Sequence, residues 1–160
     1  MYALHYAHRE SEVHMTSQKT VVSFGEEYKK RKFDDLFTQA MSLTESMATY
    51  LDGQGRRECK KLSRALQGAY VGASMQMTSR MLMLASWALV QRSQLEGEEV
   101  DGWGTARAKR AIADLYSNQW STEHPQLRAL PETFQAFYDN VVSLHHRMVA
   151  IDSGSRVRGV

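Results

Sequence analysis

The stretch Met81-Leu-Met-Leu-Ala-Ser-Trp-Ala-Leu-Val90 decides the fold of this 160-residue chain, because Ser86 is its only polar residue. The run is too long for an ordinary strand, too short to span a bilayer, and free of Gly and Pro. It therefore predicts the middle of a long helix that is apolar on nearly every side. Such a helix must be covered all round, and its own bundle covers only one side. A second chain or a partner is expected on the other side, which points to assembly or adaptor work and away from catalysis.

The composition favours one helical domain. Apolar residues make up 42% of the chain and charged residues 24%, which allows a core of ordinary size. Both prolines, Pro125 and Pro131, lie late in the chain, so no proline breaks a helix before them. The net charge of +2 is too small to imply a nucleic-acid partner by itself.

Cysteine usage and the absence of targeting patterns indicate a cytoplasmic protein. The single Cys59 excludes an intrachain disulfide and suits a reducing compartment. The first ten residues do not have the pattern of a signal peptide, and no apolar run reaches membrane-spanning length. We therefore expect no membrane association.

Helical periodicity begins after Gly25 and predicts a first helix that ends at the turn Asp52-Gly-Gln-Gly55, with glycine supplying a left-handed cap. A very long second helix is predicted from about Arg56 to Gln94. A turn-rich connection over 95–104 and a short helix after Thr105 follow. The last helix opens near Pro131 after a loop over 117–130.

The fold class that follows is all-α. It is a three-helix bundle with a very long second helix, plus a short extra helix between helices two and three. Residues 1–23 are polar and aperiodic and are interpreted as a flexible N-terminal arm. Residues 24–151 form the bundle domain, and residues 152–160 are interpreted as a disordered C-terminal tail.

The second helix carries two apolar stripes that lie nearly opposite each other. The main stripe runs through Met77, Met81, Leu84 and Ala88. The other, which we call the second stripe, consists of Val71, Met75, Leu82 and Leu89. The middle helix of a bundle touches two neighbours, so the second stripe is either additional core or a surface for a dimer or partner. We favour the interface, because two opposite stripes exceed the arc that a bundle helix usually needs.

A basic patch precedes the second stripe and consists of Arg57, Lys60, Lys61 and Arg64. It either docks an acidic partner or is a solvated face with some ion pairing. A helical DNA-binding regulator is the alternative function that such clusters leave open. DNA binding would need a turn followed by a recognition helix, and no convincing arrangement of this kind is found.

The sequence supports no metal site, cofactor site or catalytic site. His5 and His8 lie in the predicted arm, and the adjacent His145 and His146 point to different sides of a helix. Cys59 is interpreted as a half-buried helix residue, since no nucleophile motif surrounds it. A small enzyme that uses this thiol or a histidine is the lowest-ranked alternative.

Four stretches together resemble the "regulator of CtrA degradation" family of alphaproteobacterial proteins, over about residues 20–151. They are Val22-Ser-Phe-Gly25, Tyr50-Leu-Asp-Gly-Gln-Gly-Arg56, Met81-Leu-Met-Leu-Ala-Ser-Trp-Ala-Leu-Val-Gln-Arg92 and Leu130-Pro-Glu132. The third is fairly specific, and the others are weak alone.

The resemblance implies a non-enzymatic three-helix bundle that forms a homodimer. It implies an adaptor that brings cell-cycle regulators to the ClpXP protease together with a response-regulator partner. Recruitment to the cell pole is implied in the same way. The family carries a longer C-terminal tail than the nine residues that follow the last predicted helix here.

Overall fold

The computed structural model describes the backbone of residues 3–97, 102–120 and 123–157. It describes the side chains of residues 25, 27–97, 106, 108–120 and 123–154. The described backbone is helical with short connections and contains no strand, which confirms the all-α fold. No helix in the described ranges is both long and apolar enough to cross a membrane.

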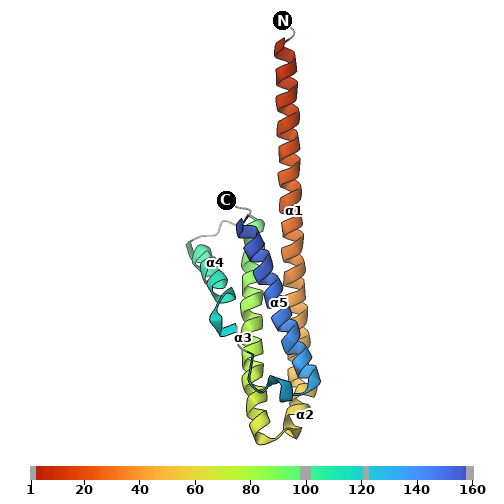
Figure 1. The fold of residues 1–160 in the computed structure, drawn as a ribbon, viewed down its shortest axis with the longest axis vertical. Helices are drawn as coiled ribbons and strands as arrows, with labels where there is room; N and C mark the ends of the chain where they lie inside the picture. Colours follow the sequence, from red (N-terminus) through yellow and green to blue (C-terminus); the bar gives the residue numbers. More distant parts are fainter. Residues whose placement is uncertain (1–2, 98–101, 121–122, 158–160) are drawn as a thin grey trace.

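Three helices form the bundle (Figure 1). They are α1 (Ala3–Asp52), α3 (Arg64–Leu95) and α5 (Glu132–Val157). The short α2 (Gln54–Lys61) closes one end between α1 and α3. The extra helix α4 (Gly102–Leu115), which the sequence predicts between the second and the last helix, packs beside α3. Two 3₁₀ turns, η1 (Asn118–Trp120) and η2 (Leu127–Ala129), lead from α4 to α5.

The predicted second helix is in fact two helices, and this corrects the expectation of one helix from Arg56 to Gln94. Leu62 has an extended backbone with ψ of 157°, which ends α2. Ser63 then starts α3 as its N-cap, and its hydroxyl accepts a hydrogen bond from the Leu66 amide at 3.4 Å. The longest helix is therefore α1 and not the second one.

The glycines at the end of α1 also have a different role from the predicted left-handed cap. Gly53 has a φ of −102°, so its backbone is not left-handed. Gly55 is buried in α2, and a Cβ atom there would lie 2.3 Å from the Tyr70 hydroxyl and 2.8 Å from the Tyr50 ring. Gly55 is therefore needed for close packing of α2 against α1 and α3. The one described residue with a positive φ is Gly97, at 70°, just after α3.

Both ends of the chain contain more helix than the sequence predicts. α1 already begins at Ala3, inside the predicted arm over 1–23, and its first part extends beyond the other helices (Figure 1). α5 continues to Val157, inside the predicted tail over 152–160. No proline stands in either segment, so helical hydrogen bonding is not interrupted. The division into arm, bundle domain and tail remains a prediction.

The core lies between the apolar faces of the three bundle helices. Trp87, Phe134 and Met148 are among its fully buried side chains. Aromatic pairs tie the helices together: the ring centroids of Phe33 and Trp87 are 5.6 Å apart, and those of Tyr70 and Phe134 are 4.7 Å apart. The apolar run that predicts the fold thus occupies the middle of the bundle, with Trp87 inserted against α1.

Candidate protein-binding surface

The second stripe lies on the outer face of α3. Val71, Met75, Leu82 and Leu89 expose 55, 67, 63 and 41% of their surface, respectively. The main stripe, by contrast, is buried at Met77, Met81, Leu84 and Ala88. The additional-core interpretation therefore does not describe the second stripe within this chain. A line of large apolar side chains facing solvent is a feature of protein-binding surfaces.

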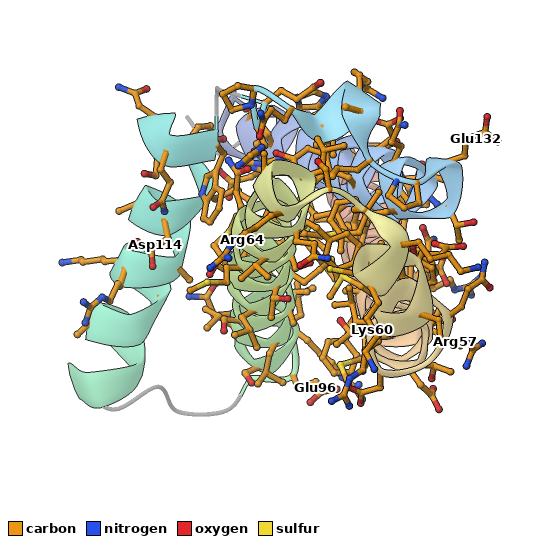
Figure 2. The ribbon with its side chains drawn as sticks, turned by 90° about the horizontal axis from the view of Figure 1, so that it is seen from below. Arg57, Lys60, Arg64, Glu96, Asp114 and Glu132 are labelled. Atoms are coloured by element: carbon orange, nitrogen blue, oxygen red, sulfur yellow. The ribbon has the colours of Figure 1, made fainter. Side chains whose placement is uncertain are left out.

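The arrangement of the helices explains why this face is open. α3 has α1 and α5 on one side and α4 on the other, and none of the described helices covers it between α4 and α1 (Figure 2). The buried residues of α3 take up the arc that faces its three neighbours. The second stripe occupies the remaining arc, because its members recur at steps of four and seven residues along the helix.

A groove runs beside the second stripe, between α3 and the segment formed by α4 and η1. Its volume is about 340 Å³. Leu82 belongs both to the second stripe and to the groove wall. The remaining lining residues are Ser79, Met83, Ser86, Ala111, Asp114, Gln119 and Trp120. The groove thus adjoins the second stripe at Leu82 and combines apolar side chains with polar serine, aspartate and glutamine groups.

Arg80 is a buried cation that contacts Trp120, one of the residues that line this groove. The side chain is 3% exposed, and its guanidinium donates a hydrogen bond to the backbone carbonyl of Trp120. The same guanidinium lies 5.2 Å from the centroid of the Trp120 ring and 5.9 Å from that of Tyr138. Its described contacts are therefore aromatic rings and a carbonyl rather than carboxylates, and burial lowers the pKa of Arg80 from its ordinary value.

His145 on α5 holds the end of α4. Its Nε2 atom donates a hydrogen bond of 2.7 Å to the carbonyl of Leu115, and its ring meets the Trp120 ring edge-on at 6.4 Å. Trp120 in turn donates from Nε1 to the carbonyl of Asp114 at 2.9 Å. Burial lowers the pKa of His145, and the nearby positive charges of Arg80 and His146 lower it further. This side chain is therefore a neutral structural group at pH 7.

The basic patch is divided by the break between α2 and α3. Its four residues are all exposed. Arg57, Lys60 and Lys61 belong to α2, whereas Arg64 begins α3. Figure 2 shows Arg64 on the side of α3 that faces α4, away from Arg57 and Lys60. The structure does not bring all four cations onto one surface, and docking of an acidic partner on this patch remains a prediction.

Within the described side chains, no group of three His, Cys, Asp or Glu residues is placed to hold a metal ion. His5, His8 and His14 lie outside the described side chains. Cys59 is a free, partly buried thiol on α2.

Arg80 and Trp120 are the contributors to this surface that the sequence argument missed. A signal for Arg80 was present, because this charged residue falls on the core-facing side of an otherwise apolar helix. Trp120 lies in a segment predicted as loop, and its role depends on a contact with a residue 40 positions earlier. No local pattern shows such a contact.

The comparisons with known proteins agree on a family. The family described as protein of unknown function (DUF1465) matches residues 24–159. The solved structure of RcdA from Caulobacter crescentus CB15 is similar, with 32% sequence identity and a TM-score of 0.57. That match covers 75% of this chain and 87% of the RcdA chain. No curated protein matches the sequence.

Proposed function

Since the chain belongs to the family described as protein of unknown function (DUF1465), we propose, from its similarity to RcdA and from its second stripe, that it is a non-enzymatic adaptor in regulated proteolysis. In this proposal it delivers cell-cycle regulators to the ClpXP protease together with a response-regulator partner. It acts in the cytoplasm, as a homodimer, and without a cofactor. The resemblance to the regulators of CtrA degradation supports these finer statements.

The exposure of the second stripe is the observation that carries the proposal. Its members expose between 41 and 67% of their surface along one face of α3. Monomeric proteins rarely leave large apolar side chains in such a contiguous line. A surface of this kind provides area for another protein chain and offers no nucleophile, base or metal ligand to a small substrate.

Delivery by an adaptor needs no chemistry from the chain itself. An adaptor that binds both a substrate and an unfoldase raises the local concentration of the substrate at the enzyme. The bundle supplies a rigid body, and the second stripe and the groove beside it supply apolar contact area. The basic residues of α2 offer a separate surface at the end of the molecule.

A reconstituted degradation assay tests the function. Purified ClpXP, the response-regulator partner and a candidate cell-cycle substrate are combined with and without this protein, and loss of the substrate is followed over time. We expect faster loss when the protein is present. The variant Leu82→Glu should abolish the acceleration, because it places a charge in the middle of the second stripe.

The matched control is Ala136→Glu, which adds the same charge at an exposed position of α5. This variant should accelerate degradation as the wild-type chain does. Both variants should keep the helical circular dichroism spectrum of the wild type. Degradation that is unchanged by well-folded wild-type protein would contradict the adaptor function, and full activity of Leu82→Glu would contradict the role of the stripe.

A further inference from the structure

Another pocket lies between α1 and the last turns of α5, at the end of the bundle where α1 continues past α5 (Figure 1). We call it the α1–α5 pocket, and its volume is about 310 Å³. It is lined by Gly25, Tyr28, Lys29, Lys32 and Phe33 of α1 and by Ala150, Ile151 and Gly154 of α5. None of these residues lines the groove beside the second stripe, so the two hollows are separate surfaces.

Small residues on both helices create the hollow. Gly25 and Gly154 have no side chain, and a Cβ atom at either position would have nothing within 4 Å. Ala150 contributes only a methyl group. Phe33 is 4% exposed, and its ring packs on Trp87, so this part of the wall belongs to the core. An apolar side chain from another molecule can therefore lie against Phe33 while the core keeps its packing.

Two exposed cations border this apolar hollow. Lys29 and Lys32 both line the pocket. The ammonium nitrogen of Lys32 lies 4.7 Å from the centroid of the Tyr28 ring, a cation–π contact that keeps this charge beside the pocket. Glu27, the described carboxylate next to them in the sequence, pairs instead with Arg31 at 3.4 Å.

The positive charge of the pocket is not neutralised within the described part of the chain. Neither Lys29 nor Lys32 belongs to an ion pair among the described side chains. Asp152 is near in sequence to the lining residues of α5, but it is 6% exposed and accepts a hydrogen bond from the Tyr116 hydroxyl at 2.8 Å. A complementary occupant therefore combines an apolar group with negative charge close beside it.

The size of the pocket favours a peptide over a lipid. Its lining residues on α1 extend from 25 to 33, which corresponds to about 12 Å along a helix. The hydrocarbon of one membrane leaflet is about 15 Å thick, half of the bilayer core, so an acyl chain would extend out of the pocket. A single aliphatic or aromatic side chain fits within it, and such anchors in small pockets are typical of protein recognition.

We propose that the α1–α5 pocket binds an acidic peptide segment of another protein. One apolar side chain of the segment lies against Phe33, and neighbouring Asp or Glu carboxylates pair with Lys29 and Lys32. The inference rests on the proposed function in that the segment belongs to a protein that the adaptor delivers or contacts. It adds a recognition site of stated chemistry that is separate from the second stripe.

Selection from a phage-displayed library of short random peptides tests the chemistry of the partner. The full-length chain is the bait, and the Gly154→Leu variant is the parallel bait. We expect the wild-type chain to enrich peptides with a Leu, Met or aromatic residue beside several Asp or Glu residues, and the variant to lose this enrichment. Enrichment of basic peptides, or no enrichment at all, overturns the proposal.

Filling the pocket tests where the peptide binds. The most enriched peptide is synthesised with a fluorescent label, and its Kd is measured by anisotropy. Gly154→Leu and Ala150→Leu should each raise the Kd about tenfold or more, because the apolar side chain of the peptide is no longer buried. Leu favours helix more than Gly does and about as much as Ala, so both variants should keep the wild-type circular dichroism spectrum.

The matched control is Ala136→Leu, the same substitution at another exposed position of α5. It should leave the Kd unchanged. Wild-type affinity in both Gly154→Leu and Ala150→Leu would place the peptide elsewhere and overturn the proposal.

Neutral substitutions test the two cations. Lys29→Gln and Lys32→Gln should each raise the Kd about two- to fivefold, as expected for exposed ion pairs. Lys30→Gln is the control, because Lys30 is also exposed but does not line the pocket. An equal effect of all three variants would contradict the pairing of the carboxylates with Lys29 and Lys32.

A last pair of measurements separates this inference from its alternatives. Vesicles that contain phosphatidylglycerol should not sediment the protein, and sedimentation that Gly154→Leu abolishes would overturn the assignment to a peptide. Peptide binding in the pocket by a chain without effect on degradation would contradict only the proposed function. Faster degradation by a chain that selects no acidic peptide would overturn only the role of the pocket.

Discussion

Arg80 on α3 donates a hydrogen bond to the backbone carbonyl of Trp120 on η1 and lies 5.2 Å from the centroid of the same indole ring. This contact joins the middle of the bundle to the segment that follows α4. Trp120 also lines the groove beside the second stripe. We therefore expect this buried cation to contribute to the position of Trp120 at the groove.

Replacement of Arg80 should loosen α4 and η1 without unfolding the bundle. Arg80→Met keeps an unbranched stem of similar length but removes the donor, so the Trp120 carbonyl loses its partner. We expect a loss of about 1–3 kcal/mol in the free energy of unfolding. Amide hydrogen exchange should become faster at residues 108–120 and stay unchanged in the buried part of α3. Exchange that is unaltered in both regions would show that the contact does not hold the segment.

His145 should make the stability of the protein depend on pH. Its pKa is lowered in the folded state from the usual 6.5, so the unfolded chain binds a proton more readily. The stabilisation is therefore complete above pH 6.5 and is lost as the pH falls toward the lowered pKa. Urea unfolding at pH 7.5 and 5.5 should show this decrease, and His145→Gln should reduce it. The exposed His146→Gln is the control and should reduce the decrease by much less, because His146 is only the smallest of the causes that lower the pKa of His145. An equal effect of both variants would rule out His145 as the source.

Gly55→Ala should destabilise the junction of α1, α2 and α3. The added Cβ atom would lie 2.3 Å from the Tyr70 hydroxyl and 2.8 Å from the Tyr50 ring, so one of these rings must move. Overpacking of this kind costs about 1–3 kcal/mol. Gly25→Ala is the matched control, because nothing lies within 4 Å of its Cβ position in α1. Thermal unfolding should show a lower Tm for the first variant and an equal or higher Tm for the second.

Tyr50→Phe should raise the pKa of Glu58. The Tyr50 hydroxyl donates to this carboxylate at 2.6 Å and is the main reason why the pKa of Glu58 lies below its usual 4.5. The stabilisation from this contact is present above pH 4.5 and is lost as the pH falls through the lowered pKa. A carboxyl titration followed by NMR should show the upward shift in Tyr50→Phe. No shift is expected in Tyr28→Phe, at a tyrosine that is 60% exposed.

Periodicity was sufficient to predict the bundle and the location of the second stripe, because both depend on which residues share a helix face. The residues Val71, Met75, Leu82 and Leu89 are exposed as a line. That the stripe binds a second chain remains a prediction.

Features set by contacts distant in sequence were not predictable in the same way. The break at Leu62 and Ser63 was missed because the apolar pattern continues across it, although Ser63 is a good N-cap residue. Gly55 was assigned to a helix cap from its place in the sequence. A glycine is needed there because Tyr50 and Tyr70 approach its backbone closely, and this approach exists only once α1 and α3 have packed together. The helix over residues 3–23 was missed because those residues show no apolar face.

The shortness of α2 has a consequence for how the molecule presents charge. A helix of eight residues is not stable by itself in water. The position of Arg57, Lys60 and Lys61 is thus maintained by the glycine and the two tyrosines beneath them, and not by the helix that carries them. A substitution of the buried glycine or of either tyrosine can therefore move these three cations, although it changes no residue of the charged surface itself.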